Sequence, residues 1–255
     1  MILGGVSRAS SRYWEIDTFR GFAVFEMMVY HFLFDGVYLG IFSVPLYAWW
    51  MRIFLFSIGG LFLLLVGVSI AVAVPRLRRR GDERDVWYWA GRRSLIIFGL
   101  GMLVSVGTFL WDPVCFVKFG VLHCIGMCIV LAIPFEKRSF WWSIGAGSLC
   151  IALGVLLYDQ VVSVPYFFIF GLTYPGFCSL DFFPLLPWFG VVLWGVAIGK
   201  MLYPQGKRRF DLVDCSENVV VSLLSFVGRH SLLVYLLHQP IIVGVLLLLS
   251  GRGWI

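Results

Sequence analysis

Residues 17–38, DTFRGFAVFEMMVYHFLFDGVY, form the first long apolar run of the chain. A helix of this length, at ~1.5 Å per residue, crosses a hydrocarbon core of roughly 30 Å. The run nevertheless carries Asp17, Arg20, Glu26, His31 and Asp35. At about 100° per residue, all of these except Glu26 share one stripe of the helix. A charge at the bilayer centre costs roughly 3 kcal/mol, so the stripe must face protein or water.

Composition places the whole chain in a membrane. Its 255 residues are 60% hydrophobic and 13% charged, with a mean hydropathy of +0.92. These values predict an all-α polytopic bundle, a single transmembrane domain over 1–255. Residues 1–16 lack the apolar core of a cleavable signal peptide. Strands are not expected, because the apolar runs are long and do not alternate.

The bundle is expected to have about seven spans, with the N-terminus cytoplasmic and the C-terminus outside. Every lysine and arginine then falls on a cytoplasmic segment except Arg52, Lys118 and Arg252. This placement predicts a multi-pass protein of the cell membrane, and the net charge of +6 needs no nucleic acid to explain it. The expected spans are 17–39, 51–74, 93–111, 119–135, 141–159, 185–203 and 229–249, the last beginning earlier if 219–227 joins it.

Two loops stand out between the spans. The basic segment 76–93 is interpreted as a topology signal close to anionic lipid heads, in preference to a phosphate site. The segment 160–183 is too rich in aromatic and apolar residues for a solvated linker, so we expect it to fold back as a lid over the outer mouth.

All four histidines lie inside or at the end of an expected span. His31, His238 and His123 make up an outer-to-middle polar layer together with Asp35, and these four are the candidate catalytic residues. Asp35 follows His31 by one helical turn, so its carboxylate is expected to orient the imidazole as a general base. For any single histidine, an interhelical hydrogen bond is the alternative interpretation. No zinc-type spacing links the histidines or the six cysteines, so no metal is expected.

A second polar layer lies at the inner ends of the first and last spans. Asp17, Arg20, Arg229 and His230 form this layer and could hold an anion. On the outer side, Asp181 is either a helix cap or an acceptor-binding residue. Tyr38, which continues the stripe of the first span, is the second candidate for binding the acceptor. Glu26 faces away from the stripe and is expected to pair with another helix.

Five segments resemble the membrane acyltransferase family that contains the catalytic domain of heparan-α-glucosaminide N-acetyltransferase, in its short prokaryotic form. They are EIDTFRGFAVFEMMVYHFLFD (15–35), LFLLLVGVSIAVA (61–73), KFGVLHCIG (118–126), DFFPLLPWFGVVLWGVAIG (181–199) and GRHSLLVYLLHQP (228–240). The resemblance implies that acetyl-CoA is the co-substrate and donates from the cytosolic side. It also implies that an amine or hydroxyl of a glycan-like or polyol acceptor receives the acetyl group outside.

On this interpretation, the pyrophosphate of CoA would lie near Arg20 and Arg229, and the thioester would reach His31 or His238. Direct transfer with histidine as base and an acyl-histidine intermediate both fit. A proton-coupled transporter that uses the His/Asp layer is the first alternative, although no inverted repeat is visible. A non-catalytic membrane partner is the second. The sequence leaves open which acceptor and which acyl chain are used and whether the protein is a monomer or a homodimer. It also leaves open the redox state of Cys115 and Cys178.

Overall fold

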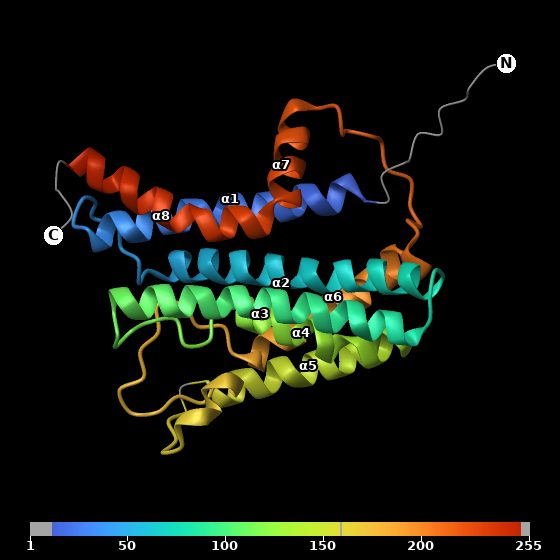
Figure 1. The fold of residues 1–255 in the computed structure, drawn as a ribbon, viewed down its shortest axis with the longest axis horizontal. Helices are drawn as coiled ribbons and strands as arrows, with labels where there is room; N and C mark the ends of the chain where they lie inside the picture. The colour runs from blue at the N-terminus through green and yellow to red at the C-terminus, as the bar shows by residue number, and fades with distance from the viewer. Residues whose placement is uncertain (1–11, 159, 251–255) are drawn as a thin grey trace. The chain divides into compact units, whose positions relative to one another are not determined.

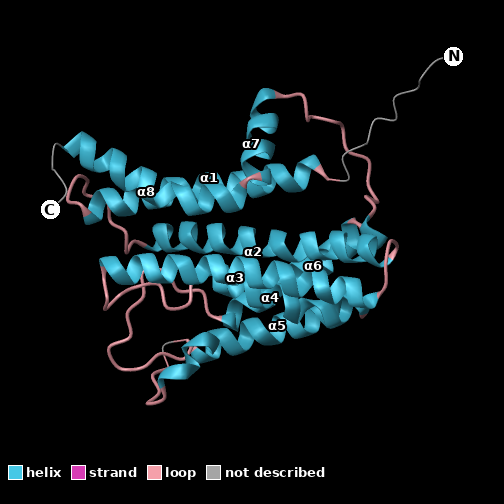
Figure 2. Cartoon of the chain, viewed as in Figure 1, coloured by secondary structure: helices cyan, strands magenta, loops and turns pink. Residues whose placement is uncertain are grey.

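The computed structural model describes residues 12–158 and 160–250, which form helices joined by loops (Figures 1 and 2). The all-helical prediction is confirmed, because the described part contains no strand and only isolated β-bridges. The chain divides into two compact units, Met1–Arg52 with Val213–Ile255, and Ile53–Leu212. Arg8 and Arg252, which entered the charge argument, lie outside the described residues.

Unit 1 contains three helices: α1 (Trp14–Tyr38), α7 (Val219–Arg229) and α8 (Ser231–Ser250). The apolar run 219–249 is therefore two helices and not one extended span. The break falls at His230, whose backbone leaves the helical region with φ −106° and ψ 18°. Asn218 starts α7 because its side chain accepts hydrogen bonds from the backbone N–H groups of Val220 and Val221.

Glycines allow α1 and α7 to cross with their backbones in contact. A Cβ built at Gly21 would collide with the carbonyl oxygen of Leu224, and one built at Gly228 would collide with that of Asp17. Beside this crossing, the hydroxyls of Thr18 and Ser225 lie 2.7 Å apart. Small residues let membrane helices approach this closely, and hydroxyl groups then add interhelical hydrogen bonds.

Unit 2 is built from five long helices. They are α2 (Trp49–Arg78, whose first turn is grouped with unit 1), α3 (Glu83–Trp111), α4 (Val121–Lys137), α5 (Phe140–Leu157) and α6 (Leu185–Leu202). The short 3-10 helices η1 (Pro165–Phe170) and η2 (Pro204–Gly206) flank α6. Gly67 meets Gly195 where α2 packs on α6, and Gly147 meets Gly190 where α5 packs on α6.

Five helices, α2, α3, α5, α6 and α8, are long and apolar enough to cross a membrane. Two further expected spans coincide with α1, which carries the ionisable stripe, and with α4, which has 17 residues. The chain is thus a multi-pass membrane protein, and seven spans with a cytoplasmic N-terminus stay a prediction.

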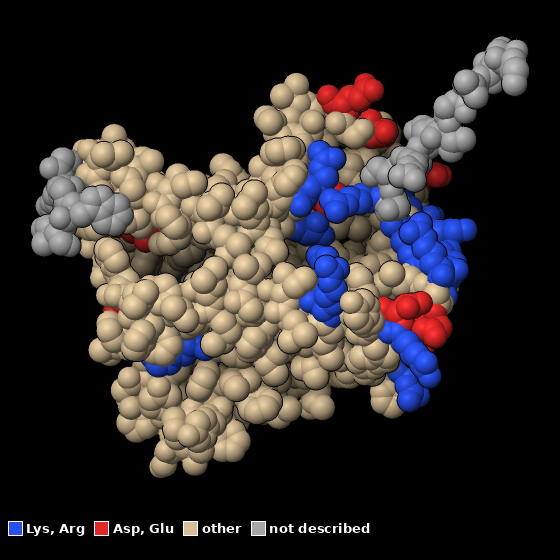
Figure 3. Space-filling model, in the orientation of Figure 1, with Lys and Arg blue, Asp and Glu red and all other residues tan. Residues whose placement is uncertain are grey.

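One end of unit 2 is basic and tied together by hydrogen bonds. Arg76 donates to the carbonyl of Gly206, and Arg78 forms ion pairs with Glu83 and Glu136. Lys200 donates to the carbonyls that end α4. Figure 3 shows Lys and Arg gathered where α2 turns into α3. Several arginines of the basic segment therefore already have protein partners, which agrees with a structural role for it.

The opposite end of unit 2 is closed by a disulfide between Cys115 and Cys178, whose Cα atoms are 4.7 Å apart. It joins the α3–α4 loop to the segment 160–183, which contains η1. Lys118 reinforces the junction, since its ammonium donates to the carbonyls of Val114 and Cys178 at 2.7 and 2.5 Å. Burial lowers the pKa of Lys118, and the nearby Asp112 opposes this shift. The segment expected to be a lid thus packs on a loop of its own unit.

Candidate functional site

The centre of the candidate site is a pair of imidazoles, His31 on α1 and His238 on α8. Their ring centroids are 4.8 Å apart and their planes are inclined by 59°. Helix α8 begins directly after the break at His230 and packs along α1, which brings its third turn to the ionisable stripe. Unit 1 therefore brings together two of the histidines that the sequence placed in the outer-to-middle layer.

The hydrogen bonding of His238 determines which ring nitrogen can act as a base. Its Nδ1 lies 2.6 Å from the backbone carbonyl oxygen of Tyr235. A carbonyl oxygen only accepts, so Nδ1 carries the hydrogen and Nε2 of the neutral ring has a lone pair. Nε2 has no hydrogen-bond partner among the described residues, and only 6% of the His238 surface is exposed. His31 likewise leaves Nδ1 without such a partner.

Asp35 does not make the hydrogen bond to His31 that the helical spacing predicted. Both of its carboxylate oxygens accept from Nε2 of Gln239, at 2.9 Å each. Packing explains the difference, because α8 presents the Gln239 amide to the carboxylate from across the helix interface. Gln239 was not predicted as a site residue. In the sequence, only its position directly after His238 pointed to it. That position identifies a site residue only when the structure shows that Gln239 lies on the side of α8 that contacts α1.

The inner polar layer lies at the crossing of α1 and α7. Arg20 and Asp17 form an ion pair of 2.8 Å on α1. His230 places Nδ1 2.9 Å from the carbonyl of Phe226. The guanidinium of Arg229, at the exposed end of α7, makes no hydrogen bond or ion pair with any described residue. Along α1, Arg20 of the inner layer and His31 of the outer layer are eleven residues apart. At ~1.5 Å per residue, the two layers are separated by about 16 Å along the helix axis.

Two other α1 residues were singled out from the sequence. Tyr38 lies at the end of the helix with 64% of its surface exposed, and its substrate-binding role stays a prediction. Glu26 was expected to pair with another helix, but its Oε2 has no hydrogen-bond partner among the described residues. The structure therefore gives no support to the expected pairing of Glu26.

His123 belongs to unit 2, where it has a packing role. Its Nδ1 accepts from the backbone N–H of Gly120 at 3.2 Å, which satisfies a donor at the start of α4. The ring is 1% exposed and contacts the rings of Phe98 and Phe119, with centroids 4.9 and 5.6 Å away. A catalytic role of His123 stays a prediction. Its Nδ1 is bonded at the start of its own helix, and its buried Nε2 has no hydrogen-bond partner among the described residues.

Asp181 also stabilises the start of α4. Its Oδ2 accepts from the backbone N–H of Val121 at 3.0 Å. It was considered as a cap of the span that follows it in sequence, but the helix that it caps is its neighbour α4. This hydrogen bond is sufficient reason for a carboxylate at position 181. A substrate-binding role of Asp181 stays a prediction.

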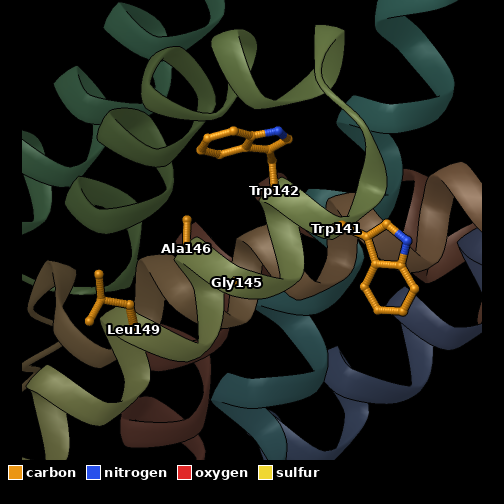
Figure 4. A pocket seen from close by; sticks show the side chains of 5 residues that line it. All are labelled: Trp141, Trp142, Gly145, Ala146 and Leu149. Atoms are coloured by element: carbon orange, nitrogen blue, oxygen red, sulfur yellow. The ribbon is translucent and has the colours of Figure 1, made fainter.

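A shallow groove of ≈ 380 Å³ lies on α5 (Figure 4) and offers no chemistry for catalysis. It is lined by Trp141, Trp142, Gly145, Ala146 and Leu149, and none of these side chains titrates. Tryptophans near a helix end are typical of the membrane–water interface. In the described residues, no three histidine, cysteine, aspartate or glutamate side chains form a group that could hold a metal ion.

Comparison with known proteins gives one match. The family model described as heparan-alpha-glucosaminide N-acetyltransferase, catalytic, covers residues 12–240. The match spans both units and includes the His31/His238 pair, Asp35 and Gln239. No curated protein and no solved structure matches the chain.

Proposed function

Because the chain belongs to the family of the heparan-α-glucosaminide N-acetyltransferase catalytic domain, we propose that it is a membrane acetyltransferase in which His238 is the general base. Acetyl-CoA is the donor, and an amine or hydroxyl of a sugar or polyol is the acceptor. The observation that carries the proposal is Nε2 of His238, which has no hydrogen-bond partner among the described residues, in a ring that is held by the bond from Nδ1 to Tyr235 and lies next to the ring of His31. A fixed imidazole with an available lone pair suits proton abstraction from an attacking N–H or O–H group.

The reaction requires one proton transfer and one exchange of bonds. Nε2 of His238 takes the proton from the acceptor as its nitrogen or oxygen attacks the thioester carbonyl. The C–S bond then breaks, and the CoA thiolate leaves and takes up the proton that His238 holds, so the imidazole returns to its neutral form. Two charged imidazoles at this separation would repel each other, so His31 stays neutral while His238 is protonated. The alternative route, in which one of the two histidines first accepts the acetyl group, uses the same pair.

The inner layer is proposed to hold the phosphates of CoA. Arginine binds phosphate oxygens through several N–H groups at once, and the guanidinium of Arg229 makes no bond to a described residue. Arg20 lies on the same helix as His31, and the pantetheine arm would extend along α1 from one layer to the other.

Delivery of the acetyl group from the cytosol to the outside is supported by the two ends of unit 2. Basic segments favour the cytoplasmic side, and disulfides persist in oxidising compartments outside it. In unit 2 the arginine-rich turn and the Cys115–Cys178 disulfide lie at opposite ends. Two independent physical criteria therefore agree on one orientation.

The test uses the purified protein in detergent with radiolabelled acetyl-CoA and a panel of amines and sugars. We expect His238→Ala to lower transfer by about 10²-fold or more, the usual contribution of a general base. Leu237→Ala, the adjacent and largely exposed position of α8, is the matched control and should keep full activity. Full activity of His238→Ala would refute the role of that residue.

The same preparation separates the enzyme from the carrier. Absence of CoA binding and of acetyl transfer in the wild-type protein would refute the acetyltransferase proposal. Counterflow of a solute in liposomes without acetyl-CoA would then favour the proton-coupled carrier.

A further inference from the structure

We propose that Gln239 binds the acceptor through its amide oxygen and that Asp35 is the positioning residue that aims this oxygen. The inference rests on the proposed function and extends it to a residue outside the imidazole pair. Gln239 would take a hydrogen bond from a second N–H or O–H group, next to the one that reacts at His238. The site would thereby prefer acceptors with two neighbouring donor groups.

The first step is the orientation of the amide. Nε2 of Gln239 lies 2.9 Å from each carboxylate oxygen of Asp35. An ionised carboxylate accepts hydrogen bonds and donates none, so the NH2 end of the amide must face it. The carbonyl end, Oε1, then points away from Asp35. A single interhelical contact thus determines which end of the amide is available.

The second step is that this oxygen has no partner. Oε1 of Gln239 is shielded from solvent and makes no hydrogen bond to a described residue. Leaving a buried carbonyl unsatisfied costs about 1–3 kcal/mol, and proteins avoid this cost unless a ligand or water fills the position. The neighbouring Nε2 of His238 is in the same state. Two adjacent residues therefore each present one unsatisfied acceptor atom.

The third step is that both atoms lie at the same helix interface. His238 contacts His31, and Gln239 contacts Asp35. His31 and Asp35 are one turn apart on α1, a separation of roughly 5–6 Å between Cβ atoms. A molecule that enters between α1 and α8 would meet two hydrogen-bond acceptors at close range. Only a molecule with two donor groups satisfies both.

The arrangement predicts which acceptors bind well. A plain alkyl amine satisfies His238 but leaves Gln239 Oε1 unbonded. An amino sugar or a vicinal diol satisfies both atoms. Sites built to bond a polar group discriminate strongly against analogues that lack it, because the site's own buried groups are then left unpaired.

The experiment compares wild-type protein with Gln239→Met, which keeps the length of the side chain but removes both polar ends. Gln160→Met, at an exposed loop position, is the matched control. The probes are glucosamine, with neighbouring amine and hydroxyl groups, and butylamine, with an amine alone. Acetyl-transfer kinetics give KM for each probe, and thermal stabilisation without acetyl-CoA reports binding independently of catalysis.

We expect Gln239→Met to raise KM for glucosamine about tenfold, equivalent to about 1.4 kcal/mol, and to reduce its thermal stabilisation. KM for butylamine and for acetyl-CoA should stay within twofold. Asp35→Asn should raise KM for glucosamine by a smaller factor, because the amide loses its fixed orientation but not its oxygen. Gln160→Met should match wild type throughout.

The outcomes distinguish this inference from the proposed function. Unchanged KM and unchanged stabilisation by glucosamine in Gln239→Met would overturn the inference while acetyl transfer by the wild type upholds the function. Conversely, a wild type without transferase activity whose stabilisation by glucosamine is lost in Gln239→Met would refute the function and support Gln239 as a ligand-binding residue.

Discussion

The crossing of α1 and α7 makes a quantitative prediction about Gly228. Its Cα faces the backbone of α1, and an added methyl group would overlap the carbonyl oxygen of Asp17 and lie 2.9 Å from the nitrogen of Gly21. Ordinary contacts between heavy atoms are about 3.5–4.0 Å. Both neighbours are backbone atoms that cannot rotate away, so Gly228→Ala must push the two helices apart.

The magnitude follows from two opposing effects. Overpacking of a well-packed interface costs about 1–3 kcal/mol, and contact with rigid backbone puts this site at the upper end. Alanine is a better helix former than glycine by about 1 kcal/mol. The net destabilisation is therefore about 2 kcal/mol. For a chain of 150–250 residues, 1 kcal/mol shifts Tm by about 2–4 °C, so Tm should fall by about 4–8 °C.

Gly244 supplies the matched control, because it lies on α8 of the same unit and an added methyl group there meets no atom within 4 Å. Gly244→Ala should leave Tm unchanged or raise it, since only the helix-propensity effect applies. Thermal unfolding of both variants in detergent, followed by tryptophan fluorescence, measures the difference. Equal Tm values for Gly228→Ala and Gly244→Ala would refute the close crossing.

The same substitution also tests the placement of the donor site. Gly228 precedes Arg229, so separation of the helices should weaken CoA binding in Gly228→Ala and leave it unchanged in Gly244→Ala. Wild-type affinity for CoA in a clearly destabilised Gly228→Ala would contradict the assignment of Arg229 to the phosphates.

Three further predictions concern the end of unit 2 that carries the disulfide. Asp181→Ala should lower the free energy of unfolding by about 1 kcal/mol, because the N–H of Val121 loses its cap. Asp181→Asn retains an accepting oxygen and should lose less. Equal melting temperatures of Asp181→Ala and wild type would contradict the cap. Breaking Cys115–Cys178, which are 63 residues apart in sequence, should cost about 4 kcal/mol on the chain-entropy model, with the free Cys215→Ser as control. A membrane-impermeant reductant should act on this disulfide from outside intact cells, and reduction only in inverted vesicles would contradict the predicted orientation.

The sequence alone predicted the helical architecture and most helix positions well. Apolar runs long enough to span a bilayer are a local property, since each helix satisfies its own backbone hydrogen bonds. The ends of α2 to α6 agree with the expected spans within a few residues, except that α3 begins ten residues earlier, at Glu83. The last expected span, 229–249, agrees with α8 (Ser231–Ser250). Only its possible extension to 219 is wrong, because the backbone leaves the helical region at His230.

The sequence also located the ionisable stripe of α1, because residues one turn apart share a helix face whatever their surroundings. It placed His31 and His238 in the same layer by counting along their spans. The match over residues 12–240 shows the family. It agrees with the resemblance found in the five sequence segments between residues 15 and 240. These conclusions needed only one-dimensional information.

Tertiary structure decided which partner each polar group has. Asp35 could reach His31 along its own helix, yet Gln239 approaches from α8 and takes both carboxylate oxygens. His123 satisfies a backbone donor at the start of its own helix. The physical reason is that helical periodicity specifies a face, whereas a hydrogen bond needs an atom at about 3 Å in a given direction. The stripe in residues 17–38 could be read from the chain, but the partner of Asp35 and the ring beside His31 depend on the packing of α8 against α1.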